Sequence, residues 1–439
     1  MTCSLTRGLP SRARRAPRAS ALAALAFLAA GCEQSLFDAG GGKQEPDLLG
    51  ATCPADCLAD ASRDFNGTAG GKDGTWRYLD DHRDRTWAPM TASDGKLVGA
   101  EAGLTISVCD KASTAPSCVA LPGALLVSTT GATSSADPAL EFTATDKRAV
   151  QISTKVYVPE NSVMQQLLIY RNSREDLLYA GPAVPGVTLE PSIDVDVIPG
   201  DRLLVALAPA SGGAADIGLE VFLSDVGKPS KCQVALDFTT AAGTTAPNYC
   251  GMAFTSRDYD NGDVEIAPTL GDGPFPELGT AAVITPGKYY KGVELLDKSG
   301  DVTIQFWMKL LTIDNTYPGY PFSDHDLDSG GGVNIDVYDR GGTITLESLS
   351  PVRNGPPYIG GDAPLPNYGT WTFVRTVHTQ GMVSVCLNGK RVISYDAPAG
   401  RLNSAFPPHL GKNVRWSPVA VVNGSMDDVR VVSAALPCE

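Results

Sequence analysis

The sequence predicts an all-β protein with two β-sandwich domains. Only 19% of its 439 residues are charged, and 46 Gly and 32 Pro supply the turns that many short strands need. Apolar and polar residues alternate with period two in short segments, which is the pattern of half-buried strands. A chain of this length exceeds one ordinary hydrophobic core, so we expect two domains and further segments outside them.

Residues 1–31 have the pattern of an export signal. Five arginines and no acidic residue accompany an apolar run over residues 21–30, which is too short to span a bilayer. The run ends in AAGC at residues 29–32, which resembles the lipobox of bacterial lipoproteins. The resemblance implies cleavage before Cys32 and a lipid on its thiol, and two or three acyl chains would anchor the protein durably. A plain secretory signal and a buried helix are the alternatives.

The residues after the cysteine refine this expectation. In many Gram-negative lipoproteins an Asp at the next position favours the inner membrane, and this chain has Glu33 there. The resemblance therefore implies a protein exported and lipid-anchored to the bacterial outer membrane. Residues 32–62 include three consecutive glycines and are predicted to be a flexible tether.

The charge of the exported part excludes one class of partner. Removing five arginines leaves 30 Lys and Arg against 49 Asp and Glu, a formal charge of −19. Such a polyanion repels phosphate backbones, so we do not expect nucleic acid as a partner. Divalent cations and neutral ligands are better candidates.

Eight cysteines remain once Cys3 leaves with the signal and Cys32 carries lipid. An even number in an exported chain predicts four disulfides, although spacing alone allows 105 pairings. Cys109 and Cys118 flank a turn-rich connector and are expected to pair, and so are Cys53 and Cys57. Zinc is the alternative at the latter two, but no second close pair of Cys or His follows, so we do not expect a metal–thiolate site.

Residues 63–226 are predicted to form the first β-sandwich. Period-two alternation is clear over residues 149–158 and 202–207, and turn signals lie between such segments. Residues 76–79, Trp87 and the turn and strand at 199–205 loosely resemble accessory β-sandwich modules of secreted proteins that handle polysaccharide. We favour core and edge packing for the aromatic residues of this region over a sugar-stacking face; the residues concerned are Trp76, Tyr78 and Trp87.

Residues 227–231 are predicted to be a linker, and a second domain follows at 232–438. Its strand-like segments 301–309, 371–375, 383–393 and 424–432 occur in the order found in laminin-G-like, concanavalin A-like jelly rolls. The resemblance implies two packed antiparallel sheets. Independently of it, Asn388-Gly389 between apolar segments predicts a two-residue hairpin, because both central positions of a type I′ turn need positive φ.

The jelly-roll resemblance also implies two further disulfides. In that fold the first and last strands lie side by side, which would bring Cys232 to Cys438. Cys250 and Cys386 are then left to pair with each other.

The sequence lacks a recognisable catalytic motif, so we expect a protein that is not an enzyme. Glucanases of the concanavalin A-like superfamily carry Glu-x-Asp-x-x-Glu on one strand, which places alternate carboxylates in the cleft, and no such run occurs. Gly-x-Ser-x-Gly, His-Glu-x-x-His and phosphate-binding loops are absent too. A divergent glycoside hydrolase or lyase and a passive envelope protein are the alternatives.

Two acidic clusters are candidate calcium sites. Alternating carboxylates beside permissive glycines can surround a cation that prefers oxygen ligands. Solvated turns in an acidic protein are the alternative for each cluster. The candidate ligands of Ca2+ are Asp324, Asp326, Asp328, Asp258, Asp260 and Asp263. Asp427 and Asp428 are adjacent on a predicted strand, so we expect their side chains to point to opposite faces.

Aromatic residues directly before one cluster suggest a binding loop. Aromatic faces stack on sugar rings, and a neighbouring carboxylate accepts hydrogen bonds from hydroxyls. The candidate ligand-binding residues are Tyr317, Tyr320, Phe322 and Asp324; rings that merely cover the sheet edge are the alternative. The sequence thus predicts a cell-surface lipoprotein that binds glycan or protein.

Overall fold

We analysed a computed structural model of the chain. It describes residues 57–72, 74–81, 87–100, 103–129, 137–209, 215–227, 231–313, 318–324, 332–339, 343–351, 358–379, 381–397, 404–414 and 422–438. All of these belong to one compact unit, Leu48–Glu439. Within them the only α-helix is the five-residue α1 (Pro116–Ala120), and no helix is long and apolar enough to cross a membrane.

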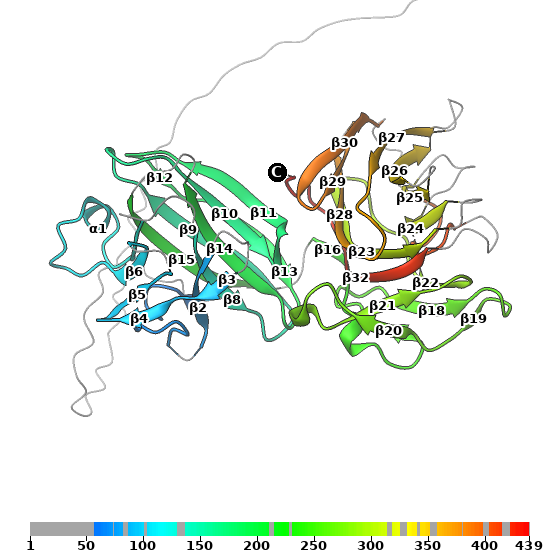
Figure 1. Ribbon diagram of the computed structural model, residues 1–439, viewed down its shortest axis with the longest axis horizontal. Helices are drawn as coiled ribbons and strands as arrows, with labels where there is room; N and C mark the ends of the chain where they lie inside the picture. Colours follow the sequence, from blue (N-terminus) through cyan, green and yellow to red (C-terminus); the bar gives the residue numbers. More distant parts are fainter. Residues whose placement is uncertain are drawn as a thin grey trace, which may run out of the picture. The chain divides into compact units, whose positions relative to one another are not determined.

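The first sandwich, coloured blue to green in Figure 1, consists of two antiparallel sheets. Sheet A contains β1 (Cys57–Asp60), β4 (Thr91–Ser93), β5 (Lys96–Val98), β6 (Thr105–Val108), β7 (Leu125–Ser128), β9 (Arg148–Tyr157), β12 (Thr188–Leu189), β13 (Ser192–Val197) and β15 (Asp216–Gly227). Sheet B contains β2 (Trp76–Asp81), β3 (Trp87–Pro89), β8 (Pro138–Thr143), β10 (Gln165–Arg171), β11 (Ser173–Ala183) and β14 (Arg202–Pro209).

The second sandwich, coloured green to red in Figure 1, also has two antiparallel sheets. Sheet C contains β16 (Cys232–Leu236), β20 (Thr269–Asp272), β21 (Thr280–Ile284), β23 (Val302–Thr312), β28 (Trp371–Thr379), β29 (Met382–Leu387), β30 (Lys390–Asp396) and β32 (Asn423–Val432). Sheet D contains β17 (Thr245–Ala246), β18 (Phe254–Asp258), β19 (Val264–Glu265), β22 (Lys288–Gly292), β24 (Gly319–Ser323), β25 (Asn334–Asp339), β26 (Ile344–Pro351), β27 (Tyr358–Pro364) and β31 (His409–Leu410). Two short 3-10 helices, η1 (Phe238–Thr240) and η2 (Pro276–Leu278), connect strands.

The core of the first sandwich is formed by alternate residues of its strands. Val150, Ile152 and Val156 of β9 lie in it, as the sequence pattern predicts. Trp76 and Tyr78 belong to the same core, and the Tyr78 hydroxyl donates a 2.7 Å hydrogen bond to a backbone carbonyl. These two rings therefore pack inside rather than forming a sugar-stacking face.

The first sandwich begins earlier than the sequence suggested. β1 pairs antiparallel with β15, with Asp60 opposite Phe222. Residues 57–62, predicted to belong to the tether, thus form part of the folded body. The remainder of the predicted tether, together with Cys32, the predicted site of the lipid, lies outside the described residues.

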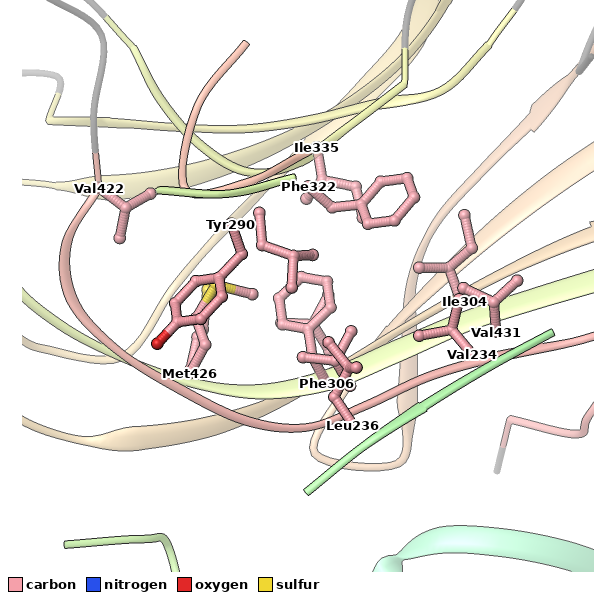
Figure 2. Close-up of a cluster of buried hydrophobic side chains, with 14 of the residues drawn as sticks. Val234, Leu236, Tyr290, Ile304, Phe306, Phe322, Ile335, Val422, Met426 and Val431 are labelled. Atoms are coloured by element: carbon pink, nitrogen blue, oxygen red, sulfur yellow. The ribbon is translucent and has the colours of Figure 1, made fainter. Parts of the chain in front are cut away.

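The second core lies between sheets C and D. Figure 2 shows Phe306 of β23 close to Phe322 of β24 and Ile335 of β25, with Tyr290 of β22 beside Met426 of β32. Each of these side chains is at most 2% exposed. The predicted hairpin is confirmed: Leu387 pairs with Lys390, and Asn388 and Gly389 have φ of 48° and 84°.

The first strand of the second sandwich lies beside its last, as the jelly-roll resemblance implied, with Cys232 opposite Val432. The pairing of Cys232 with Cys438 is nevertheless wrong, because Cys232 is bonded to Cys250. Asn248 causes this local closure, since its Oδ1 accepts from the backbone nitrogens of Ala235 and Cys250 at 2.8 and 3.0 Å. The loop after the first strand thereby returns onto that strand.

The predicted pairing of Cys250 with Cys386 is also wrong, because each of the two cysteines is bonded to another partner. Cys386 is bonded to Cys438. After β32 the chain continues to Pro437, whose carbonyl accepts a 2.6 Å hydrogen bond from Arg375 of β28. Arg375 is the register partner of Cys386, so Cys438 arrives beside it.

The Cys109–Cys118 disulfide is confirmed. Cys57 is also disulfide-bonded, and its predicted partner Cys53 lies outside the described residues.

A buried cluster of charges links strands of the first sandwich to strands of the second. Asp176 of β11 accepts a 2.8 Å hydrogen bond from Arg171 and forms an ion pair with Arg375 of β28. Gln305 of β23 donates to the same carboxylate at 3.2 Å. A second pair joins Asp201 to Arg430 of β32 at 2.6 Å. None of these side chains is more than 2% exposed, so both pairs are desolvated.

Candidate functional site

The candidate site is the face of sheet D that points away from the core, which we call the polar face. Phe322, Ile335 and Leu410 point into the core, so their strand neighbours point to the opposite side. Those neighbours are Ser323, Asn334 and His409, and they are aligned across three strands: Ser323 is the register partner of both His409 and Asn334. One more step along β25, Asp336 lies on the same face.

Buried polar atoms on this face lack hydrogen-bond partners. Ser323, Asn334, Asp336 and His409 are each at most 5% exposed. No residue that the structure describes pairs with Ser323 Oγ, Asn334 Oδ1, Asp336 Oδ1 or His409 Nδ1. Leaving a buried polar atom unpaired destabilises the folded state by about 1–3 kcal/mol. Four such atoms on one face are therefore unfavourable unless a ligand or water supplies the missing hydrogen bonds.

Carboxyl groups continue the face toward its edge. Asp336 is opposite Glu347 on β26, and Glu347 is opposite Asp362 on β27. Exposure rises along this row, from buried Asp336 through half-buried Glu347 to exposed Asp362. Burial, followed by the charge of Glu347, raises the pKa of Asp336 well above its usual value. The row therefore begins with a carboxyl group that keeps its proton to higher pH than an ordinary aspartic acid.

The other end of the polar face is aromatic and cationic. The Tyr289 and His409 rings lie 5.2 Å apart, and Lys412 Nζ lies 4.9 Å from the Tyr289 ring. Burial, followed by the charges of Lys412 and Lys291, lowers the pKa of His409 to about 3. The imidazole is thus neutral at physiological pH, with one nitrogen able to donate and the other to accept.

The aromatic residues predicted to bind ligand are not brought together as expected. Phe322 lies in the core at 1% exposure, so its prediction as a ligand-binding ring is wrong (Figure 2). That prediction treated these residues as a loop, whereas Gly319–Ser323 form the strand β24, on which Phe322 faces the core. Tyr320 is 8% exposed and lies near Tyr338, at the polar face. Tyr317 lies outside the described residues.

Asp324 is not available as the loop ligand that the sequence suggested. It is fully buried, forms an ion pair with Lys298, and accepts a 2.7 Å hydrogen bond from the Val333 backbone. The other two members of its predicted cluster, Asp326 and Asp328, lie outside the described residues.

The second acidic cluster is divided among separate interactions. Asp258 accepts a 2.7 Å hydrogen bond from Asn261, whereas Asp263 binds Arg257 at 2.9 Å; Asp260 follows in the turn between them. Among the described residues, no group of three or more His, Cys, Asp or Glu is arranged to hold a metal ion. Calcium binding therefore stays a prediction.

Most residues of the polar face were missed by the sequence reasoning. The segment 334–338 reads Asn-Ile-Asp-Val-Tyr, a period-two pattern whose polar members carry the site. That signal was present, but it is equally typical of a solvated strand face. The alignment with His409, which is 75 residues further along, follows only from the sheet order.

Comparison with protein families agrees with this architecture. Residues 283–439 match the model for the concanavalin A-like lectin/glucanases superfamily. The chain carries a concanavalin A-like domain. The match begins within β21, so it covers the strands of sheet D from β22 onward, including the polar face.

Among solved structures, the chain with its concanavalin A-like domain is similar to domain 4 of AbnA, a GH43 extracellular arabinanase from Geobacillus stearothermophilus, at 18% identity over 47% of this chain and 95% of that one, with a TM-score of 0.32. It is similar to the CBM22 tandem domain of Paenibacillus barcinonensis Xyn10C at 13% identity over 88% of this chain and 100% of that one, with a TM-score of 0.25. It is also similar to domains LG4-5 of the mouse laminin α1 chain, at 11% identity over 66% of this chain and 83% of that one, with a TM-score of 0.25. No curated protein matches the sequence.

Proposed function

We propose that this chain is an exported, lipid-anchored protein that binds glycan, without cleaving it, through the polar face of its concanavalin A-like domain. The observation that supports the proposal is the set of four buried polar atoms without partners on one face of sheet D. Protein interiors rarely leave such atoms unpaired, and clusters of them indicate a site whose partner is a ligand.

The chemistry of the face fits a hydroxyl-rich ligand. Asn334 Oδ1 and His409 Nδ1 each accept a hydrogen bond, because the other ring nitrogen of His409 already bonds the backbone of Asn413. The carboxyl of Asp336, whose raised pKa favours its protonated form, can donate as well as accept. Sugar hydroxyls also donate and accept, so they can satisfy all these groups without adding charge. The half-buried Tyr338 ring, which follows Asp336 on the same face of β25, provides apolar surface for sugar C–H groups.

A matched pair of serine variants tests the binding site. Ser323 on the polar face and Ser384 on sheet C are both buried with an unpaired Oγ. We expect Ser323→Ala to weaken glycan binding about threefold to tenfold, because it removes one hydrogen bond to the ligand, and Ser384→Ala to leave affinity unchanged. A glycan array identifies the ligand, and calorimetry of the full chain measures both variants. Equal affinities for the two variants would place the binding site elsewhere.

The anchor is tested separately at the signal boundary. We expect Cys32→Ser to abolish labelling by a radioactive fatty acid and to release the protein from the membrane fraction, because the thiol that would carry diacylglycerol is gone. Membrane retention of the unlabelled variant would contradict the anchor. Wild-type protein and the Ser384→Ala variant serve as controls for export.

A hydrolase is the second candidate, and the Asp336–Glu347 pair favours it. Directly opposed cross-strand residues have Cβ atoms about 4.5–5.5 Å apart, which suits the close carboxyl pair of retaining glycosidases. In such a reaction Asp336 would give its proton to the leaving oxygen while Glu347 forms a bond to the anomeric carbon. Water would then release the sugar and return the proton to Asp336.

Release of reducing ends from the glycan that binds best separates the two candidates. If the chain is a hydrolase, Asp336→Asn and Glu347→Gln lower the release at least 100-fold while binding persists, because general acid and nucleophile act on the bond-breaking step. If the wild type releases no reducing ends from a glycan that it binds, the hydrolase candidate is wrong and the binding proposal is unaffected.

A further inference from the structure

A cavity of about 450 Å³ lies away from the polar face, beside the last strand of the second sandwich. Its lining includes Asp427 and Asp428 of β32, Asp237 before η1, and Asp201 before β14. Tyr249, Pro276 and Leu278 supply apolar wall. Volumes of this order and walls of this kind are typical of sites for small organic molecules.

A β-bulge directs two adjacent carboxyl groups into this cavity. The register between β23 and β32 shifts between Gln305, opposite Arg430, and Trp307, opposite Asp427. Asp428 occupies the bulge with φ of 47°, a left-handed conformation that is uncommon for a residue other than glycine. Our expectation that Asp427 and Asp428 point to opposite faces is therefore wrong: both line the cavity.

One oxygen of each carboxyl group is left without a partner. Asp428 Oδ1 accepts from Arg430 at 2.6 Å, and Asp427 Oδ1 accepts from the Asp428 backbone at 2.8 Å. Asp427 Oδ2 and Asp428 Oδ2 have no hydrogen-bond partner among the described residues, and the two side chains are 1% and 4% exposed. Two buried acceptors without partners thus belong to adjacent residues of the cavity lining.

Negative charge exceeds positive charge around the cavity. Arg430 is the only basic residue in the described lining, and its guanidinium is already paired with Asp201 and Asp428. Burial, followed by the charges of Asp428 and Asp237, raises the pKa of Asp427 to about 8, with Arg430 acting in the opposite direction. Without a ligand, the cavity relieves its excess charge by keeping a proton on Asp427.

We propose that this cavity binds a small organic molecule carrying a primary ammonium group, which donates hydrogen bonds to Asp427 Oδ2 and Asp428 Oδ2 while its apolar body contacts Tyr249 and Pro276. An ammonium has three donors and one positive charge, which matches two open acceptors and the excess negative charge. A metal ion fits less well, since no group of three His, Cys, Asp or Glu in the described residues is arranged to hold one. The site is independent of glycan binding on the polar face.

Cyclohexylamine and cyclohexanol form a matched pair of probes, because they share a ring and differ in the charged group. We expect ligand-observed NMR on the full chain at pH 7 to show at least tenfold tighter binding of the amine. Asp427→Asn should remove that preference, because asparagine resembles the neutral carboxyl group in size but cannot ionise. Asp396→Asn, which changes an exposed acid on β30, should retain it.

Three results would overturn the proposal. The first is equal affinity of the wild type for amine and alcohol, which needs no variant. The second is an unchanged preference in folded Asp427→Asn, with folding verified by circular dichroism. The third is displacement of the amine by Ca2+ at stoichiometric concentration, which would make the site a metal site. Retention of amine binding in Ser323→Ala would support the separation from the polar face.

Discussion

Replacing Asp176 with asparagine should lower the free energy of unfolding by about 3–5 kcal/mol. Asp176 is 1% exposed and is paired with both Arg171 and Arg375, which are also buried. The variant would leave two desolvated guanidinium groups without their shared counter-charge, which costs more than the pair itself contributes. Urea denaturation followed by tryptophan fluorescence measures the change.

Asp146→Asn is the matched control. Asp146 also binds an arginine, Arg148, but its side chain is 53% exposed, so water screens the pair and we expect a much smaller change than for Asp176→Asn. Because Asp176 and Arg375 belong to different sandwiches, Asp176→Asn should also separate a single unfolding transition into two. A loss no larger than that of Asp146→Asn would show that Asp176 does not hold these strands together.

Replacing Asp427 with asparagine should stabilise the protein increasingly as pH rises. In the unfolded chain Asp427 ionises near its ordinary value of about 4, whereas burial and neighbouring acids raise its pKa to about 8 in the folded chain. Between these values the folded state holds a proton that the unfolded state has lost. The stability supplied by the neutral carboxyl is thus complete below about pH 4 and declines as pH rises to 8.

The variant should therefore gain about 1.4 kcal/mol per pH unit over the wild type between pH 5 and 7, and the gain should level off above pH 8. Taking the difference cancels other groups, such as His378 and His409, whose pKa values burial lowers to about 3 and which the two proteins share. Urea denaturation at pH 5, 6, 7, 8 and 9 gives the curve. A difference that does not vary with pH would mean that Asp427 is already ionised in the folded protein.

Some features of the fold could be predicted from a few consecutive residues. Asn388-Gly389 specified the hairpin of the concanavalin A-like domain because few residue pairs adopt positive φ at both positions, and the turn then fixes the register of β29 and β30. The eight-residue connector between Cys109 and Cys118 likewise limits those two cysteines to each other's neighbourhood. Features of this kind depend on a few consecutive residues, so a single sequence contains enough information to predict them.

The surroundings of polar residues on strands could not be predicted in this way. Asp324 and Asp336 both occur in acidic, strand-rich sequence, yet one is neutralised by Lys298 and the other is a buried acid without a partner at Oδ1. The difference depends on which side chain the neighbouring strand contributes. Cys250 and Cys438 were mispaired for the same reason, because Asn248 and Arg375 direct the two loops.

By itself, then, the sequence determined the all-β class, the alternating strands and the hairpin, whereas the adjacency of the first and last strands came from the jelly-roll resemblance. Only the tertiary structure decided that Phe322 faces the core, that Ser323, Asn334 and His409 share one row, and that Asp427 and Asp428 open into one cavity. Period two assigns side chains to alternate faces, but it does not say which face is covered. Sheet order and a single bulge decide that, and both arise from contacts between residues far apart in the chain.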